Sequence, residues 1–518
     1  MLPRTPPRPG GAPGEEMKRS LRALTLASLV IALAACGKKG EETTAPGGKK
    51  GSTVEEQDRQ RADLKKQAKT ETFIDLANKD LMRGRYISAR KRANDALEVD
   101  SNNADAYAVL AQSYWRGGDY VESTKAFKEA IELDKANFGA LLGLARNYQA
   151  AGMHKEAIEL AEQAAANDPK QIDPMLAKLW SYYALADADN AVKTLDSIFQ
   201  NIGEDPMVPI VQAVAAFIRP FEGKGELIKL EGAKGTSNAG LDVDGGLKYA
   251  GAVIGGEFQP VVFFELREEA RIHSDLAKSL KLKSLGKMKP IGLDTEQDVV
   301  LVPEVKIGDL KIKNVPAIVD DLSPYASIGE VPGMLLGRQV INKLGAITFD
   351  FPNASLEINT AVPAGPPAGM AESPLLLLDM HILLVPITEV VLDGSDFKFF
   401  AWLGGRYKAG MAVTRRTYLK SGNRPTELDE LDDPEQGLKM VYFESVALGD
   451  YAARGVGGLV LAANPPDPDL AQIIDGTNFE IGGYLNLALM KGMKMTFVPS
   501  AGKLYVSGRA APPAPAGG

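Results

Sequence analysis

Several acidic side chains of this sequence stand where they could act as general acids or bases. Asp294-Thr295-Glu296 and Asp393-Gly394-Ser395 place a carboxylate beside a hydroxyl, and Asp242 and Asp244 lie together in "LDVDGG". Two carboxylates that share one proton can activate water for hydrolysis, one as base and the other as acid. Asp-Gly sequences are also typical of tight hairpin turns. We therefore favour turns over catalysis for Asp393, Asp242 and Asp244, and we also disfavour catalysis at Asp294-Thr295, which is followed by glutamate rather than glycine.

Metal and nucleic-acid chemistry are not indicated. The three histidines stand in unrelated contexts, so we expect no histidine-based metal site and no cofactor: they are His154, His273 and His381. With 59 basic and 67 acidic residues, the net charge is −8, whereas a nucleic-acid binder needs a basic face. The chain of 518 residues is 45% hydrophobic, which allows about three domains.

Cys36, the single cysteine, closes an N-terminal targeting pattern. Met17-Lys18-Arg19 opens a basic stretch that is followed by an apolar run over 21–35. Such a pattern defines a secretory signal, and the run is short for a transmembrane helix, which needs roughly 20 apolar residues. Leu33-Ala34-Ala35-Cys36 resembles the lipobox of bacterial lipoproteins. The resemblance implies that 17–35 is a signal peptide and that Cys36 is lipidated; the alternative is an incidental thiol.

The segments around this signal are expected to carry no fold. Residues 1–16 precede a better start at Met17, and we interpret them as a mispredicted extension. Residues 36–69 carry almost no large apolar side chain, so we predict a flexible tether, and we expect a disordered tail over 509–518. Gly37 and Lys38 resemble the sorting signals of Gram-negative lipoproteins, which implies a periplasm-facing anchor in the outer membrane.

A repeat with a period of 34 residues occupies 70–202. Leucines, alanines and glycines recur in phase: Leu76, Leu110 and Leu144; Ala77, Ala111 and Ala145; Gly84, Gly118 and Gly152; Ala96, Ala130 and Ala164. Each unit predicts two amphipathic helices joined at the glycine. The pattern resembles the tetratricopeptide repeat, with units starting near Thr70, Ala104 and Phe138 and a divergent fourth near Ile172.

The resemblance implies a superhelix with a concave face that binds proteins or extended peptides. Asn78, Gln112 and Arg146 occupy equivalent positions that line this face in the family. We predict that they form a polar ladder for a peptide partner; the alternative is an ordinary solvated helix face. The carboxylate clamp of some family members is absent.

The pattern changes after a connector over 203–225, in which "VPIVQAVAAFI" continues the helical periodicity. From about residue 226 the chain shows short runs of β-formers broken by turn residues, which predicts strands. Three hairpins are expected, and they bend at Gly255-Gly256, Gly308-Asp309 and Pro352-Asn353. A Pro- and Gly-rich linker over 361–373 precedes a second region with the same pattern.

The second region repeats the first. "VKIGDL" at 305–310 returns as "VALGDY" at 446–451, and "AITFDFPNASLEI" is echoed by "MKMTFVPSAGKLYV". The order of elements resembles the retropepsin-like aspartic protease fold, with lobes over 226–360 and 374–508. The predicted fold is therefore multidomain: an all-α tetratricopeptide array followed by two mainly β retropepsin-like lobes.

The resemblance implies a catalytic Asp-Thr/Ser-Gly loop in each lobe, and this sequence lacks both. In lobe two, Trp402, Leu403 and Gly404 occupy the expected positions, and in lobe one Glu265-Leu266-Arg267 does so. Tryptophan can neither accept nor donate the required proton, so we predict no catalytic residues. We expect Trp402 to be a plug in the core or between the lobes rather than a ligand-stacking ring.

Three functions remain open on these grounds. The favoured one is a membrane-anchored, non-catalytic scaffold for proteins or peptides. The second is a structural lipoprotein that assembles an envelope complex, with the lobes as spacers. The third is an active aspartic peptidase with a rearranged acid pair, drawn from residues such as Asp294 and Glu265.

Overall fold

The structure is a computed structural model. It describes residues 54–167, 171–242, 247–263, 269–290, 295–379, 384–404, 407–422, 438–461 and 467–508. The chain divides into two compact units, Met1–Lys65 and Lys66–Gly518. The expected signal peptide, Cys36 and the tail over 509–518 lie outside the described residues. No described helix is long and apolar enough to cross a membrane.

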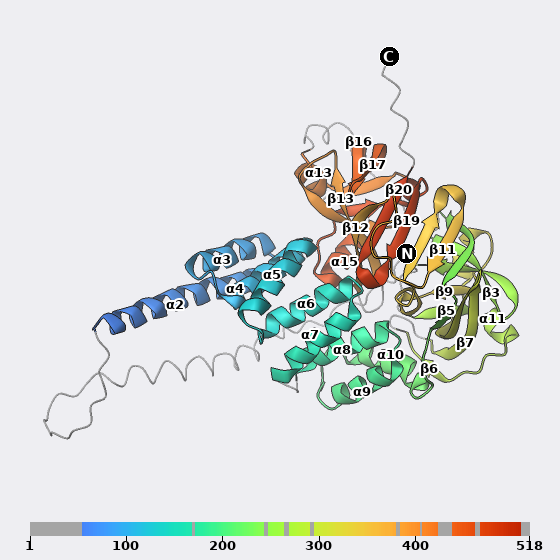
Figure 1. Ribbon diagram of the computed structural model, residues 1–518, viewed down its shortest axis with the longest axis horizontal. Helices are drawn as coiled ribbons and strands as arrows, with labels where there is room; N and C mark the ends of the chain where they lie inside the picture. The colour runs from blue at the N-terminus through green and yellow to red at the C-terminus, as the bar shows by residue number, and fades with distance from the viewer. Residues whose placement is uncertain are drawn as a thin grey trace, which may run out of the picture. The chain divides into compact units, whose positions relative to one another are not determined.

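Paired helices form the first part of the described chain (Figure 1). They are α2 (Val54–Met82), α3 (Tyr86–Val99), α4 (Ala104–Arg116), α5 (Tyr120–Leu133), α6 (Phe138–Ala150), α7 (His154–Asn167), α8 (Ile172–Ala184), α9 (Ala188–Phe199) and α10 (Val208–Ile218), followed by the short helix η1 (Arg219–Phe221).

The 34-residue period has a clear physical basis in this array. The alanines at the two repeated alanine positions are completely buried, which lets paired helices approach closely. The repeated glycines all have φ between +70° and +76°, a left-handed conformation that favours glycine. Asn103 and Asn137, one repeat apart, cap α4 and α6 by accepting hydrogen bonds from main-chain N–H groups at 2.9 Å.

The fourth unit follows the same plan without its glycine. Ala186 stands one period after Gly152 and keeps the left-handed turn at φ +53°. Helix α10 coincides with "VPIVQAVAAFI", so the predicted continuation of the helical pattern is confirmed.

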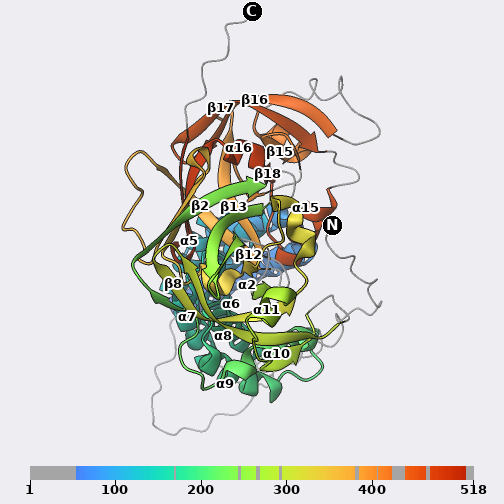
Figure 2. The same cartoon turned by 90° about the vertical axis from the view of Figure 1, so that its right-hand side faces the viewer.

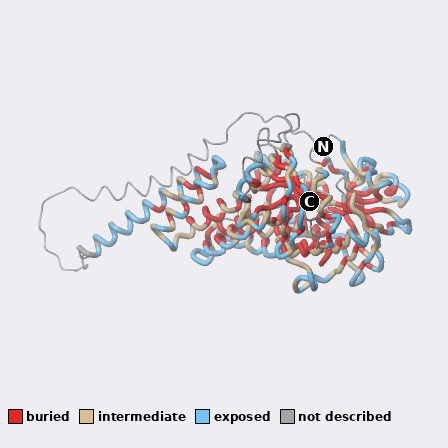
Figure 3. The backbone as a smooth tube through the Cα atoms, turned by 90° about the horizontal axis from the view of Figure 1, so that it is seen from above, coloured by how far each residue is buried: buried red, intermediate tan, exposed pale blue. Residues whose placement is uncertain are grey.

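The predicted tether over 36–69 is wrong in its second half, because α2 begins at Val54. This stretch is rich in Glu, Gln, Lys, Arg and Ala, which are strong helix formers even when no core is available. Its described side chains are largely exposed, and Figure 3 shows the start of α2 in pale blue. Low apolar content therefore excluded a core but not a helix.

The first lobe is a sheet with short helices at its connections. Its elements are β1 (Lys229–Glu231), β2 (Lys234–Asp242), β3 (Leu247–Ile254), β4 (Glu257–Phe263), β5 (Ala270–His273), α11 (Ser274–Ser279), β6 (Gly286–Met288), β7 (Gln297–Ile307), β8 (Leu310–Asp320), η2 (Ser323–Ile328), β9 (Met334–Leu336), α12 (Arg338–Ile341), β10 (Ala346–Asp350), η3 (Phe351–Asn353) and β11 (Ser355–Asn359). The three predicted hairpin bends are confirmed.

The second lobe consists of β12 (Ala371–Asp379), β13 (Leu384–Leu392), β14 (Lys398–Leu403), β15 (Met411–Thr414), α13 (Arg415–Lys420), β16 (Leu438–Leu448), β17 (Tyr451–Leu461), α15 (Pro468–Thr477), β18 (Gly483–Leu485), α16 (Leu487–Met490), β19 (Met493–Val498), η4 (Pro499–Ala501) and β20 (Lys503–Gly508). Figure 2 shows β16 and β17 as a long hairpin. Because β12 begins at Ala371, the predicted linker over 361–373 is shorter than expected.

The two lobes have the same strand connections. In lobe one, β4 lies parallel to β9 and β5 lies parallel to β8. In lobe two, β14 lies parallel to β18 and β15 lies parallel to β17. The predicted duplication is therefore present in the pairing of the strands as well as in the sequence.

A strand pair between equivalent elements joins the lobes. β10 of lobe one pairs with β19 of lobe two, and Thr348 stands opposite Thr496. Their hydroxyl oxygens are 2.8 Å apart. Phe263 and Phe497 both pack edge to face on Phe349, at 5.5 Å and 6.4 Å between ring centroids. Equivalent strands thus share one core at the junction.

Candidate functional site

The helical array lies against the lobes through its glycine turns. Gly118 and Gly152, one repeat apart, sit directly on the second lobe. A Cβ at Gly118 would collide with the carbonyl oxygen of Glu480, and a Cβ at Gly152 with that of Pro499. Each glycine therefore serves two purposes, since it turns the chain and allows the lobe backbone to approach.

Polar and aromatic contacts extend this interface. The indole Nε1 of Trp115 in α4 donates to the main-chain carbonyl of Thr477, and its ring packs edge to face on Phe479 at 4.8 Å. The phenol of Tyr86 donates to the Glu480 carboxylate, which also pairs with Arg416 at 2.9 Å. Burial, together with the neighbouring carboxylate, raises the pKa of Tyr86.

The first lobe contacts the array through the start of α12. Arg338 is buried and donates to the carbonyl of Gln149 at 2.9 Å. Its guanidinium also lies 3.2 Å from Nε2 of His154 and 3.5 Å from Asp379. Asn342 places its amide nitrogen 3.3 Å from the same Nε2.

His154 is neutral in this setting. The amide nitrogen of Asn342 and the guanidinium of Arg338 can only donate, so Nε2 must accept and the ring hydrogen must lie on Nδ1. Burial lowers the pKa of His154 well below its ordinary value, and the positive charge of Arg338 lowers it further.

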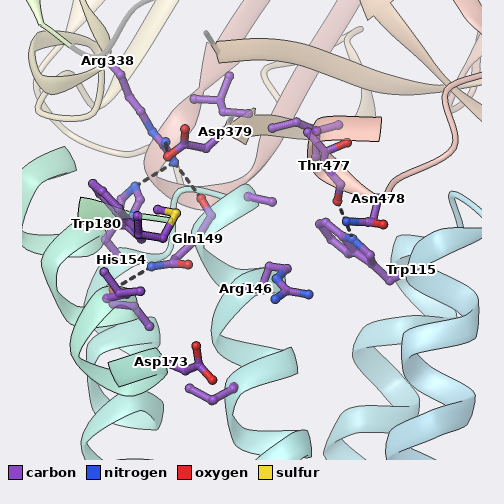
Figure 4. A pocket seen from close by; sticks show the side chains of 18 residues that line it. Trp115, Arg146, Gln149, His154, Asp173, Trp180, Arg338, Asp379, Thr477 and Asn478 are labelled. Carbon is purple, nitrogen blue, oxygen red and sulfur yellow. Dashed lines mark hydrogen bonds and ion pairs between the residues drawn. The ribbon is translucent and has the colours of Figure 1, made fainter. Parts of the chain in front are cut away.

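A cavity of about 450 Å³ lies between the concave side of the array and the two lobes (Figure 4). Arg338 and Asp379 form one end of it, and Thr477 and Asn478 stand at another side. The lining residues are Trp115, Leu142, Arg146, Gln149, Ala150, His154, Asp173, Leu176, Ala177, Trp180, Met207, Arg338, Leu377, Leu378, Asp379, Gly476, Thr477 and Asn478. This volume lies in the usual range for small-ligand sites.

One of the three predicted ladder residues lines this cavity, and two of them meet at a smaller recess beside it. Arg146 lines it, and it also lines a smaller recess of about 60 Å³ together with Gln112 and Asn478. Asn78 is half-buried on α2 and lines neither hollow. The structure therefore brings Gln112 and Arg146 together on the concave side and leaves Asn78 apart.

The electrostatics of the cavity centre on Arg146. Its side chain is exposed to the hollow, yet protein surrounds it closely enough that burial lowers the pKa of its guanidinium. The Asp173 carboxylate opposes this shift, and Arg116 adds to it. Among the residues that the structure describes, the side chains of Arg146 and Asp173 form no hydrogen bond or ion pair.

Trp402 lies inside strand β14 and is 9% exposed. Its ring packs on Tyr484 at 5.4 Å with the planes 32° apart. It belongs to a buried cluster that also contains Trp115 and Phe479, so residues of the array and of lobe two share one core. Trp402 is therefore buried in a core, as one of the two predicted alternatives had it, but the described members of that core come from the array and lobe two and not from the two lobes.

The expected equivalence of Trp402 and Glu265 is wrong. Leu403 pairs with the last residue of β18, as Phe263 pairs with the last residue of β9. Trp402 therefore corresponds to Val262, three positions before Glu265. The sequence comparison missed this because strand register is not visible in an ungapped apolar run. Glu265, Leu266 and Arg267 lie outside the described residues.

Gly404 stands at the end of β14. Its N–H donates to the carbonyls of Trp402 and Leu485. The buried ammonium of Lys248, from lobe one, lies 3.5 Å from the carbonyl oxygen of Leu403. Neither Leu403 nor Gly404 carries a group that could transfer a proton.

Sequence reasoning missed most of the interface residues. Arg338, His154, Asp173 and Trp115 come from segments far apart in the chain, and none belongs to a recognisable motif. A signal existed only for Arg338, which directly follows the apolar-Gly segment that is repeated between the lobes. The described part of the chain contains no cluster of three or more His, Cys, Asp or Glu that could hold a metal ion.

Residues 114–179 match the family model for the tetratricopeptide repeat. The N-terminal region carries tetratricopeptide repeats. No curated protein matches the chain.

Several solved structures are similar to part of the chain. A tetratricopeptide repeat protein from Parabacteroides merdae is 17% identical, with a TM-score of 0.26, over 29% of this chain and 60% of its own length. The pilF protein of Pseudomonas aeruginosa is 19% identical, with a TM-score of 0.28, over 30% and 72%. The first tetratricopeptide domain of Spaghetti, solved with an HSP90 peptide, is 18% identical, with a TM-score of 0.22, over 23% and 97%.

Proposed function

We propose that this protein is a lipid-anchored, non-catalytic scaffold that binds proteins or extended peptides. The tetratricopeptide array supplies the binding face, and two degenerate aspartic protease-like lobes carry the array. The targeting pattern that ends at Cys36 supports a periplasm-facing anchor in a bacterial envelope membrane, the outer rather than the inner one.

The observation that carries the proposal is the meeting of Gln112 and Arg146. These side chains are one repeat apart and face the same recess on the concave side of the array. Arg146 has no hydrogen-bonding partner within the described ranges, so its donors are available to a bound chain. Repeat arrays commonly use such concave surfaces for recognition.

The absence of catalysis is supported by the end of strand β14. An aspartic protease needs two carboxylates that share a proton, one from each lobe. The residues at this end are Trp402, Leu403 and Gly404, and lobe one places the ammonium of Lys248 3.5 Å from the carbonyl oxygen of Leu403. A lysine at this contact between the two lobes would oppose proton sharing between two carboxylates, because its positive charge stabilises the ionised form of each carboxylate.

Crosslinking in cells tests the proposed binding face. The variant with Asn78→Ala, Gln112→Ala and Arg146→Ala should lose the proteins that crosslink reproducibly to the natural chain. The matched control replaces Lys91, Lys125 and Glu159 by alanine. These are also one repeat apart but are exposed on the second helix of each unit. An unchanged set of partners in the first variant would reject the proposal.

A further inference from the structure

Two opposite charges face the same cavity. Arg146 projects from α6 and Asp173 from the first turn of α8, and both line the hollow of about 450 Å³ (Figure 4). The two side chains are not joined to each other, and no other residue of the described ranges forms a hydrogen bond or ion pair with either. Asp173 lies in the first turn of α8, where the helix dipole stabilises a negative charge. No hydrogen-bond donor of the described residues reaches its carboxylate oxygens.

A second charged pair in the cavity is already matched. Arg338 lies 3.5 Å from Asp379 and also donates hydrogen bonds to the carbonyl of Gln149 and to Nε2 of His154. An incoming ligand therefore has little to gain from this pair. Arg146 and Asp173 are the groups whose charges a ligand could complement.

The remaining walls are apolar and aromatic. Trp115 and Trp180 line the cavity together with Leu142 and Leu176. Rings and leucines favour burial of an apolar side chain, and a few placed polar groups then fix its orientation.

We propose that this cavity binds a small zwitterion, namely a free amino acid or a dipeptide with an apolar side chain. Its carboxylate would pair with the guanidinium of Arg146, which presents a planar set of donors. Its ammonium would pair with Asp173, and its side chain would lie between the two tryptophans and the leucines.

This ligand differs in kind from the partner of the proposed scaffold. A residue inside a protein chain carries neither terminal charge, and a chain end carries one of them. A ligand that needs both charges must be a free amino acid or a very short peptide. The inference shares Arg146 with the polar ladder, whereas Asp173 belongs to the zwitterion site alone.

Calorimetric titration of the full-length chain tests the inference. The probes are L-phenylalanine, its N-acetyl derivative, its amide and the dipeptide Phe-Leu. We expect L-phenylalanine or the dipeptide to bind, and the single-charge derivatives to bind about tenfold more weakly or worse. Asp173→Asn should remove the preference over the N-acetyl form, and Arg146→Gln the preference over the amide.

Each outcome decides the question. Equal binding of L-phenylalanine and its N-acetyl derivative would contradict a zwitterion site and identify a carboxylate site that accepts chain ends. Absence of heat from all four probes at millimolar concentration, with a folded protein by circular dichroism, would also overturn the inference. Because Asp173→Asn leaves the ladder intact, it should retain the crosslinked proteins, so failure of this site and failure of the scaffold are distinguishable.

Discussion

The indole Nε1 of Trp115 donates a hydrogen bond of 3.3 Å to the main-chain carbonyl of Thr477. The donor lies in the second repeat of the helical array, and the acceptor ends helix α15 in the second lobe. The concave side of the array, which would otherwise be open to partners, is therefore partly occupied by the protein's own lobe. What remains accessible is the cavity and the recess beside Arg146 and Gln112.

Gly152 and Gly84 form a matched pair for testing this docking. Both have left-handed φ, +73° and +70°, but a Cβ at Gly84 meets no atom within 4 Å. Gly84→Ala should cost about 1–2 kcal/mol of unfolding free energy from backbone strain alone. Gly152→Ala should cost a further 1–3 kcal/mol or so, because its Cβ collides with the carbonyl of Pro499.

Urea unfolding followed by tryptophan fluorescence measures both variants. Equal losses in the two variants would show that the array does not press on the second lobe at this turn.

His154 predicts a dependence of stability on pH. Its pKa in the folded protein is well below the ordinary value of 6.5, so the unfolded chain binds more protons than the folded one below about pH 6.5. Stability should therefore fall as the pH drops below that value, by up to about 1.4 kcal/mol per pH unit, and should not depend on this group above it.

His154→Gln keeps an acceptor for Asn342 and Arg338 but does not titrate. Unfolding free energies of both proteins, measured across this pH range, should show a shallower slope in the variant. The same slope in both proteins would mean that His154 does not carry the effect.

Trp402→Ala tests whether this ring belongs to the core. Removing a buried tryptophan at a shared interface should cost about 3–5 kcal/mol of unfolding free energy. Trp402→Phe should lose less, because it keeps a ring against Tyr484. Circular dichroism during denaturation gives the measurement, and a nearly unchanged stability of Trp402→Ala would indicate a ligand-stacking role instead.

The helical repeats could be predicted from the sequence because local packing sets their period. Each unit needs a buried alanine at the position of Ala77 and a left-handed turn at the position of Gly84, so both residues recur every 34 positions. The hairpin bends were equally local, since Gly255-Gly256 and Gly308-Asp309 favour tight turns whatever surrounds them.

The site was not predictable in the same way. His154 and Arg338 are 184 residues apart, and their contact depends on how the array and lobe one pack. The wrong alignment of Trp402 with Glu265 has a related cause. The register of β14 is fixed by its pairing with β18, and amino-acid composition does not reveal that pairing. The helix from Val54 shows the opposite effect, in which local propensity was underestimated.

Intact-mass spectrometry of a bound partner tests whether the protein binds its partners without cutting them. A protein captured by in-cell crosslinking would be produced separately and incubated with the purified chain at acidic and at neutral pH. Its intact mass would then be measured after elution from the complex. We expect a complex that depends on Gln112 and Arg146 and a partner of unchanged mass at both pH values. Recovery of a partner cut at acidic pH would contradict this expectation, because the lobes would then be acting as an aspartic peptidase.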